Sequence, residues 1–152
     1  MIALDTNALV RMLVEDDTEQ AKIVQQLVSF AEQKSITVLI LPEVLLETVW
    51  VLESVYTIKR AEIIKVLHAL LAASTFAISH DSVVRSAIRQ YQRGFDFADA
   101  LIAGQAKKEK AQALFSFDRR LSRRFPEFVY CDFERIKKRF SVRFTVKNKV
   151  RK

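Results

Sequence analysis

Near its N-terminus the chain reads IALDTNAL (residues 2–9), a short apolar run that ends in an acidic residue. The apolar part predicts a buried strand, and Asp5 follows it directly. Thr6 or Asn7 can cap the helix that comes next, which has an apolar face of its own. A carboxylate beside a core is costly unless another group compensates its charge. The stretch therefore predicts a strand-to-helix turn that carries an acid.

Further along the chain, apolar strands alternate with helical stretches. Four more strands, apolar throughout, are predicted at residues 37–41, 75–79, 113–117 and 128–131. Apolar residues at helical spacing fill the intervals, at residues 21–31, 42–55, 59–73, 80–91 and 97–110. This order predicts an α/β protein, a three-layer α/β/α sandwich with a mainly parallel sheet of about five strands.

Composition limits the class of protein. The chain has 152 residues, 50% of them hydrophobic, and only two glycines and two prolines, so we expect a real core and short loops. The single cysteine, Cys131, excludes an internal disulfide framework and a cysteine-based metal site, as expected in a reducing cytoplasm. Asp5 interrupts the first apolar run, and no uncharged run is long enough for a bilayer. We therefore predict a cytoplasmic protein without a membrane segment.

The positive charge is concentrated at the C-terminal end. Of the net +7, residues 135–152 contribute nine Lys or Arg and no acid, which leaves residues 1–134 at −2. We therefore predict a domain at 1–134 and a basic extension at 135–152. Such an extension is typical of nucleic-acid contact and equally of a solvated, solubilising tail. Apolar residues at 140, 142, 144 and 146 alternate with polar ones, which predicts a half-buried strand.

Four acidic residues stand in or beside apolar runs: Asp5, Glu47, Asp99 and Asp118. Ligand sites of parallel sheets lie beyond the carboxyl ends of the strands, so we expect these acids to share one negative pocket. Their mutual repulsion makes such a pocket unfavourable without a cation. The natural occupant is a hard divalent cation, Mg²⁺ or Mn²⁺, which can activate a water molecule and stabilise charge on a phosphoryl group.

Two nearby acids have simpler local explanations. Glu43 follows Pro42 in the first turn of a predicted helix, where the helix dipole favours a negative charge. Asp96 precedes Asp99 by three residues and is predicted to cap the helix. The sequence has no glycine-rich phosphate loop, so nucleotide-dependent phosphoryl transfer is not expected.

Together these motifs resemble those of the PIN-domain nucleases, and among them the VapC-type toxins of bacterial and archaeal toxin–antitoxin pairs. Residues 2–9 are similar to the family's opening strand and first acid, and residues 42–52 to its second motif. Residues 95–103 are similar to the third motif and residues 116–118 to the last. The matches keep the family's order and span about residues 2–130.

The resemblance implies a Mg²⁺- or Mn²⁺-dependent endoribonuclease, the toxin of a type II pair, which forms homodimers and is inhibited by a small antitoxin. By the match, the metal-binding and catalytic residues are Asp5, Glu47, Asp99 and Asp118. The residues expected to orient carboxylates or bound water are Thr6, Asp96 and Ser116. The extension is not part of the family's motif set. On charge alone, the basic residues expected to contact nucleic acid are Arg119, Arg120, Arg135, Lys137, Lys138, Arg139 and Arg143.

Two other functions stay open. A metal-dependent DNase or flap-type nuclease would use the same acids, because phosphodiester chemistry does not distinguish the sugar. A nucleic-acid-binding module with an inactive site would need only the basic extension. The helices near residues 13–30 and 50–71 carry enough apolar surface to bind a partner helix in a groove.

Overall fold

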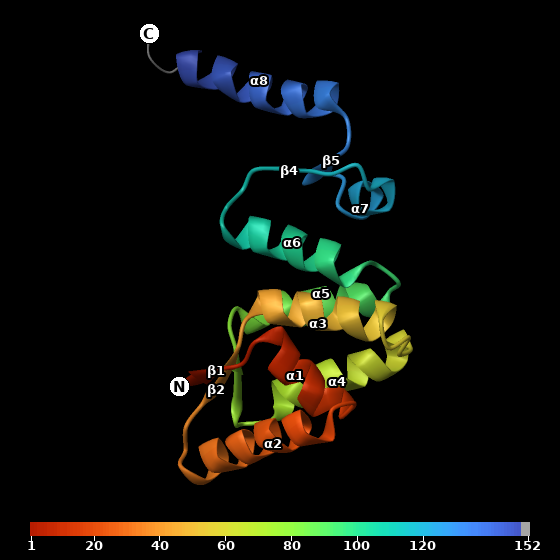
Figure 1. Cartoon of the computed structure of the whole chain (residues 1–152). Coiled ribbons are helices and arrows are strands. Elements are labelled where there is room, and N and C mark those ends of the chain that lie inside the picture. Colours follow the sequence, from red (N-terminus) through yellow and green to blue (C-terminus); the bar gives the residue numbers. More distant parts are fainter. Residues whose placement is uncertain (150–152) are drawn as a thin grey trace. The chain divides into compact units, whose positions relative to one another are not determined.

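The computed structural model describes the backbone of residues 1–149 and the side chains of residues 1–141 (Figure 1). Two compact units make up the chain, Met1–Leu101 and the residues from Ile102 onward. Both units are α/β, and every strand pairing in the described residues is parallel. The predicted fold class is confirmed, with short strands that lie in two sheets.

The first unit is built on a three-stranded parallel sheet in the order β1-β2-β3. Its strands are β1 (Ile2–Ala3), β2 (Val38–Ile40) and β3 (Phe76–Ile78). Parallel neighbours need long crossover connections, and pairs of helices supply them. The helices are α1 (Thr6–Val14) and α2 (Thr18–Gln33) before β2, then α3 (Pro42–Ser54) and α4 (Arg60–Ala72) before β3. After β3 come α5 (Asp81–Gln92) and α6 (Phe97–Lys108), whose first turn still belongs to this unit.

Short polar side chains and a proline set where helices α1, α2 and α3 begin. Asp5 is the N-cap of α1, so neither Thr6 nor Asn7 has the capping role that the sequence offered them. Asp17 caps α2, and its carboxylate accepts the amide of Gln20 at 3.0 Å. Pro42 occupies the first turn of α3, where its missing N–H costs nothing.

One large apolar cluster holds the first unit together. It takes in Leu9 of α1, Leu45 of α3, Ile63 of α4 and Tyr91 of α5, all of them fully buried. Phe97, at the start of α6, belongs to the same cluster. Full burial of a side chain of this size contributes roughly 1.5–3 kcal/mol. The first turn of α6 is therefore fixed by the core of this unit.

The second unit contains a two-stranded parallel sheet of β4 (Leu114–Phe115) and β5 (Val129–Tyr130). Helix α7 (Arg119–Arg124) connects the two strands, and helix α8 (Phe133–Lys149) follows them. The guanidinium groups of Arg135 and Arg139 lie 5.7 and 5.8 Å from the ring centroid of Tyr130. Arg139 Nη1 also donates to the Tyr130 hydroxyl at 3.1 Å. Cation–π contacts and this bond attach α8 to β5.

Two features of the second unit differ from the sequence expectation. The half-buried strand predicted for residues 140–146 is wrong, because this segment lies within α8. The side chain of Asp132 accepts the amide of Glu134 at 2.7 Å at the helix start. Phe133, Ile136 and Phe140 then recur at helical spacing. This capped helical pattern begins before the alternating segment and prevails over it. The short helix α7 was not expected.

None of the helices in the described part of the chain combines the length and apolar character needed to cross a membrane.

Candidate metal centre

A hydrogen bond joins the first residue of α1, Thr6, to the middle of α3. The hydroxyl of Thr6 donates to Glu47 Oε2 at 2.7 Å. Thr6 is buried and immediately follows Asp5, just beyond the carboxyl end of β1. The bond therefore holds one carboxylate of α3 close to the strand end at which Asp5 lies.

Asp5 itself is exposed and has a structural role as well. Its Oδ1 accepts the backbone N–H of Ala8 at 2.8 Å, as an N-cap. A carboxylate offers about four lone-pair sites, so this single bond leaves capacity for a cation. Capping and metal binding are compatible at this residue.

Glu47 is exposed, contrary to the expectation of an acid inside a buried helix. Its helix, α3, is amphipathic in practice: Leu45, Val49 and Leu52 are buried. Glu43, Glu47 and Trp50 share the opposite, exposed face, spaced at i, i+4 and i+7. The apolar sequence around Glu47 concealed this division, because Trp50 is apolar yet 59% exposed.

Asp99 lies half-buried in the first turn of α6. Its backbone N–H donates to Asp96 Oδ1 at 3.0 Å, and the Asp96 carbonyl accepts the amide of Ala100 at 3.1 Å. Asp96 therefore caps the helix, as predicted. The cap fixes the turn from which the Asp99 side chain projects.

In the second unit, Asp118 and Ser116 form a local turn of the same kind. Asp118 Oδ1 accepts the amides of Arg120 at 2.7 Å and Leu121 at 3.1 Å, which makes it the N-cap of α7. Ser116 Oγ accepts the backbone N–H of Asp118 at 3.1 Å. Ser116 thus fixes the backbone that carries Asp118. Arg119 and Arg120 are exposed at the helix start.

Within the described side chains, no three or more His, Cys, Asp or Glu residues gather in a ready-made metal cage. Mg²⁺ seldom needs such a cage, because it keeps several waters and binds through one or two carboxylates plus substrate phosphates. Asp5 and Glu47 are exposed oxygen donors, and the Thr6–Glu47 hydrogen bond holds one of them near the strand end. This donor chemistry fits Mg²⁺ or Mn²⁺ better than a softer metal.

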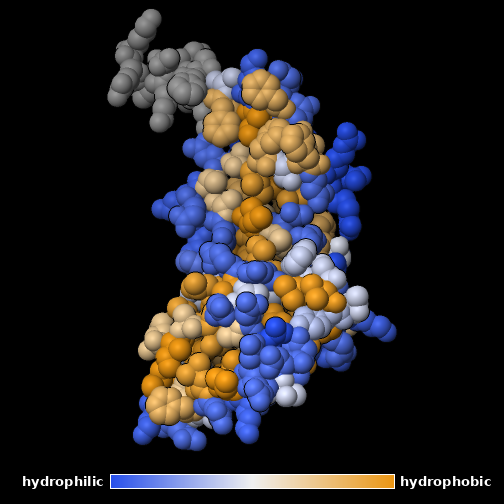
Figure 2. Space-filling model, in the orientation of Figure 1, coloured by the Kyte–Doolittle hydropathy of each residue, from blue (hydrophilic) through white to orange (hydrophobic). Residues whose placement is uncertain are grey.

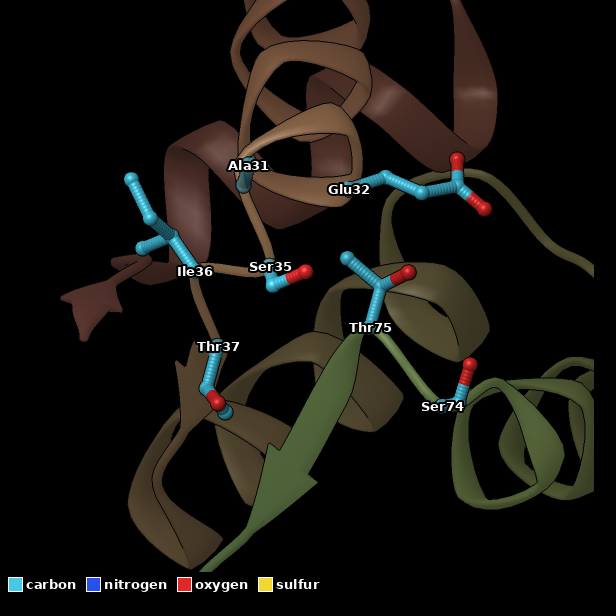
Figure 3. A pocket seen from close by; sticks show the side chains of 7 residues that line it. All are labelled: Ala31, Glu32, Ser35, Ile36, Thr37, Ser74 and Thr75. Carbon is cyan, nitrogen blue, oxygen red and sulfur yellow. The ribbon is translucent and has the colours of Figure 1, made fainter.

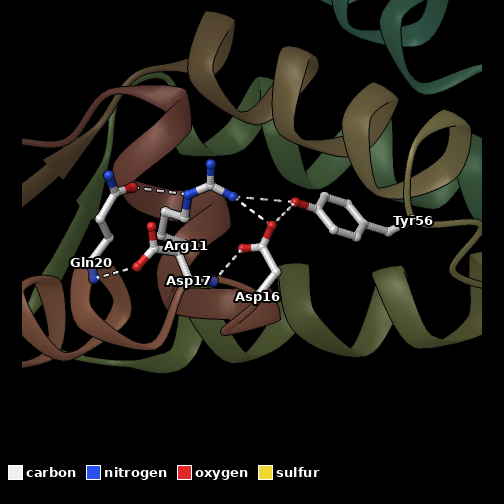
Figure 4. A network of polar contacts seen from close by, with 5 residues as sticks. All are labelled: Arg11, Asp16, Asp17, Gln20 and Tyr56. Atoms are coloured by element: carbon white, nitrogen blue, oxygen red, sulfur yellow. Dashed lines mark hydrogen bonds and ion pairs between the residues drawn. The ribbon is translucent and has the colours of Figure 1, made fainter.

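A polar network that sequence reasoning missed fixes the other end of α1 (Figure 4). Arg11 Nη1 lies 2.5 Å from Asp16 Oδ2, and the hydroxyl of Tyr56 donates to the same oxygen. Arg11 Nε also donates to Gln20 Oε1 at 3.0 Å. The Tyr56 hydrogen bond, followed by that of Arg11, lowers the pKa of Asp16. Tyr56 is 40 residues from Asp16, so local spacing gives no signal for this network.

A polar pocket of about 250 Å³ lies at the opposite edge of the sheet (Figure 3). Its walls include Thr37 and Thr75, which immediately precede β2 and β3. Their carbonyls accept the amides of Ile2 and Val38, both at 2.9 Å, and so take part in the sheet. The pocket is at the amino ends of the strands, whereas Asp5 follows the carboxyl end of β1.

Comparison with known proteins identifies the family. The model of the PIN domain matches residues 2–125, so the chain belongs to the PIN domain family. It is also 30% identical over 124 residues to a VapC ribonuclease of Aquifex aeolicus (strain VF5). This match covers 81% of the chain and 91% of that relative. The resemblance drawn from the four acidic motifs is confirmed.

Proposed function

We propose that the protein is a metal-dependent endoribonuclease and the toxin of a type II toxin–antitoxin pair. The observation that carries the proposal is the Thr6–Glu47 hydrogen bond at the end of β1, because it brings an acid of the second motif to the first. Membership of the PIN domain family and the similarity to a VapC ribonuclease support the same reaction class.

In this proposal Asp5 and Glu47 hold Mg²⁺ or Mn²⁺ at the end of β1. Asp99 and Asp118 are included as ligands because they are the acids of the third and last sequence motifs. The metal, when bound, supplies an activated water molecule and stabilises charge on the phosphate. Such carboxylates must be ionised to act as ligands, so we expect activity to fall at low pH.

The neighbouring polar residues orient these acids. Thr6 fixes the rotamer of Glu47 through its 2.7 Å hydrogen bond. Asp96 accepts the backbone N–H of Asp99 and so fixes the turn that carries Asp99. Ser116 likewise accepts the backbone N–H of Asp118 and fixes its position. None of the three needs to contact the substrate for this role.

Exposed basic side chains of the second unit are proposed to bind the phosphates of RNA. Arg119 and Arg120 are exposed at the start of α7, and Lys137 and Lys138 on α8. Arg135 and Arg139 stack on Tyr130, so we assign them first to the attachment of α8. The side chain of Arg143 lies outside the described side chains. We keep residues 1–134 as the nuclease domain and residues 135–152 as an extension that assists it.

We also propose an antitoxin and a second copy of the chain as partners, in the cytoplasm. Apolar side chains are exposed on the helices of the first unit, and Figure 2 shows them among polar ones on one face. The largest are Ile23 and Phe30 on α2 and Trp50 on α3. Partner helices that packed their apolar faces against α2 or α3 would cover these side chains.

The test compares matched RNA and DNA oligonucleotides as substrates of the full chain with Mn²⁺. Cleavage of RNA that stops in excess EDTA is the expected result. Preferential cleavage of DNA would favour the metal-dependent DNase. Tight RNA binding with no cleavage of either substrate would favour a binding module with an inactive site.

A further inference from the structure

An arginine at the start of α4 forms hydrogen bonds with the backbone that links α5 and α6. Arg60 Nη1 donates to the carbonyl of Tyr91 at 3.1 Å and to the carbonyl of Phe95 at 3.2 Å. The first carbonyl belongs to the last turn of α5. The second belongs to the residue directly before Asp96, the cap of α6. One guanidinium therefore spans the turn that leads to the candidate metal ligand Asp99.

The guanidinium is held in place by two further groups. It stacks on the ring of Tyr91, 4.3 Å from the centroid, and its Nη2 is 4.0 Å from Glu53 Oε1. The hydroxyl of Tyr91 donates to the same Glu53 oxygen at 2.5 Å. Burial, followed by this hydrogen bond, raises the pKa of Tyr91, which keeps the phenol neutral and able to donate. Glu53, Arg60 and Tyr91 thus form one cluster from α3, α4 and α5.

The turn itself is already well defined. Gly94 has a φ of 92°, and its amide donates to the Tyr91 carbonyl at 3.0 Å. The amide of Phe95 donates to the Gln90 carbonyl at 3.1 Å, which completes a Schellman motif. The rings of Tyr91 and Phe97 meet edge to face, with centroids 5.8 Å apart. The Schellman motif ends α5, and Arg60 supplies the link from that end to the cap of α6.

We propose that Arg60 is a positioning residue for the metal ligand Asp99, acting through the turn between α5 and α6. This inference rests on the proposed function, because it assigns Asp99 to the metal. The guanidinium suits the role, since its Nη1 donates to both carbonyls while its planar face stacks on Tyr91. A lysine ammonium can donate to carbonyls but has no planar face to stack on the ring of Tyr91.

The experiment compares Arg60→Met and Arg60→Lys with Arg85→Met as the matched control. Arg85 lies on α5 and forms an exposed ion pair with Asp81 at 3.3 Å, away from the turn. Three kinds of measurement are made: hydrogen exchange of the amides of Asp99 and Ala100, the Kd for Mn²⁺, and the steady-state constants kcat and KM on RNA. Wild type and Asp99→Asn are measured alongside.

In Arg60→Met we expect the two amides to exchange faster and the Kd for Mn²⁺ to rise about 10-fold or more, as for other groups that orient a ligand. Arg60→Lys should fall between wild type and Arg60→Met, and Arg85→Met should match wild type. KM for RNA should change little while kcat at limiting Mn²⁺ falls, a split that a general loss of stability would not give.

A folded Arg60→Met with the wild-type Kd for Mn²⁺ overturns the inference, whatever the exchange rates. If Arg60→Met does not fold, Arg60→Lys decides: a wild-type Kd overturns the inference, and a raised Kd in a folded protein supports it. The proposed metal site fails separately. Its failure is marked by Asp99→Asn binding Mn²⁺ as tightly as wild type.

Discussion

The hydroxyl of Thr6 donates a 2.7 Å hydrogen bond to Glu47 Oε2, across 41 residues of sequence. Thr6 is only 8% exposed, whereas Glu47 reaches the surface of α3. A buried donor thus holds an exposed acceptor in one orientation. An acid fixed in this way loses less side-chain freedom when it binds a cation, because its rotamer is already chosen.

Replacement of Thr6 by Val should therefore weaken the site more than the fold. We expect Mn²⁺ affinity or cleavage to fall by roughly 10- to 100-fold, the usual effect of removing a group that orients a ligand. The free energy of unfolding should fall by about 0.5–1.5 kcal/mol for the removal of one hydrogen bond. Isothermal titration with Mn²⁺ and denaturant unfolding measure the two effects. The control is Thr6→Ser, which keeps the hydroxyl. If Thr6→Ser bound Mn²⁺ as weakly as Thr6→Val, the hydroxyl would not be what orients Glu47.

The Arg11–Asp16–Tyr56 network predicts a loss of stability in acid. The pKa of Asp16 is lowered by Tyr56 and then Arg11, so its stabilising effect is present above the ordinary value of about 3.9. It is lost as the pH falls through the lowered pKa. Asp16→Asn should thus have a lower Tm than wild type at pH 7, and the difference should shrink below about pH 4.

Thermal unfolding from about pH 2.5 to pH 7 spans this window and makes the comparison. The control is Asp81→Asn, which removes an exposed ion pair with Arg85 and should change Tm little. A constant gap between wild type and Asp16→Asn across the whole range would contradict the predicted linkage.

Tyr91 predicts the opposite behaviour in alkali. Its pKa is raised by burial and then by the hydrogen bond to Glu53, so the neutral phenol stabilises the fold. This contribution is complete below the ordinary tyrosine pKa of about 10 and is lost as the pH rises above it. Tyr91→Phe should be less stable than wild type at pH 8, by about 1.5–3 kcal/mol for a hydrogen bond to a charged group. The free energies of unfolding of wild type and Tyr91→Phe, plotted against pH, should converge above about pH 10. A constant difference between them would contradict the stabilising role of the neutral phenol.

The exposed lysines of α8 predict a salt-dependent contribution to RNA binding. Replacing Lys137 and Lys138 by Gln should weaken binding and reduce the slope of log K against log[salt]. The slope should become shallower by about 0.7 for each phosphate of a single strand that the protein no longer neutralises. Titration of a labelled RNA in EDTA, at several salt concentrations, measures the slope without cleavage.

The control is Lys65→Gln, which removes an exposed lysine of α4 paired with Glu62 at 3.0 Å. An unchanged slope in the double variant would mean that these lysines do not contact phosphates.

Local sequence patterns predicted the strands and most helices, because buried apolar runs and capping residues act over a few neighbours. Strand β2 falls within the predicted segment 37–41, and Asp96 caps α6 as expected. The prediction of a C-terminal strand was wrong because it rested only on a short local pattern, the alternation at residues 140–146. The helix cap at Asp132 and the stripe from Phe133 to Phe140 start earlier and favour a helix.

Interactions between distant segments were harder to predict from the sequence. The pairing of Thr6 with Glu47 depends on how α3 packs beside α1, and the sequence offered only two separate motifs. The exposure of Glu47 depends on Trp50 facing solvent, which an apolar count cannot predict. Arg60 reaches Phe95 across 35 residues, and no spacing rule relates the two.

The central claim, that Glu47 binds a catalytic metal, is tested most directly by comparing Glu47→Gln with Glu43→Gln. Both acids are exposed on the same face of α3, one turn apart, but only Glu47 accepts the bond from Thr6 in the described structure. The measurement is the rate of Mn²⁺-dependent cleavage of an RNA panel. We predict that Glu47→Gln loses more than about 100-fold in rate, since a ligand and its charge are removed together. Glu43→Gln should keep nearly the wild-type rate. Equal rates in the two folded variants, at any Mn²⁺ concentration, would contradict the claim.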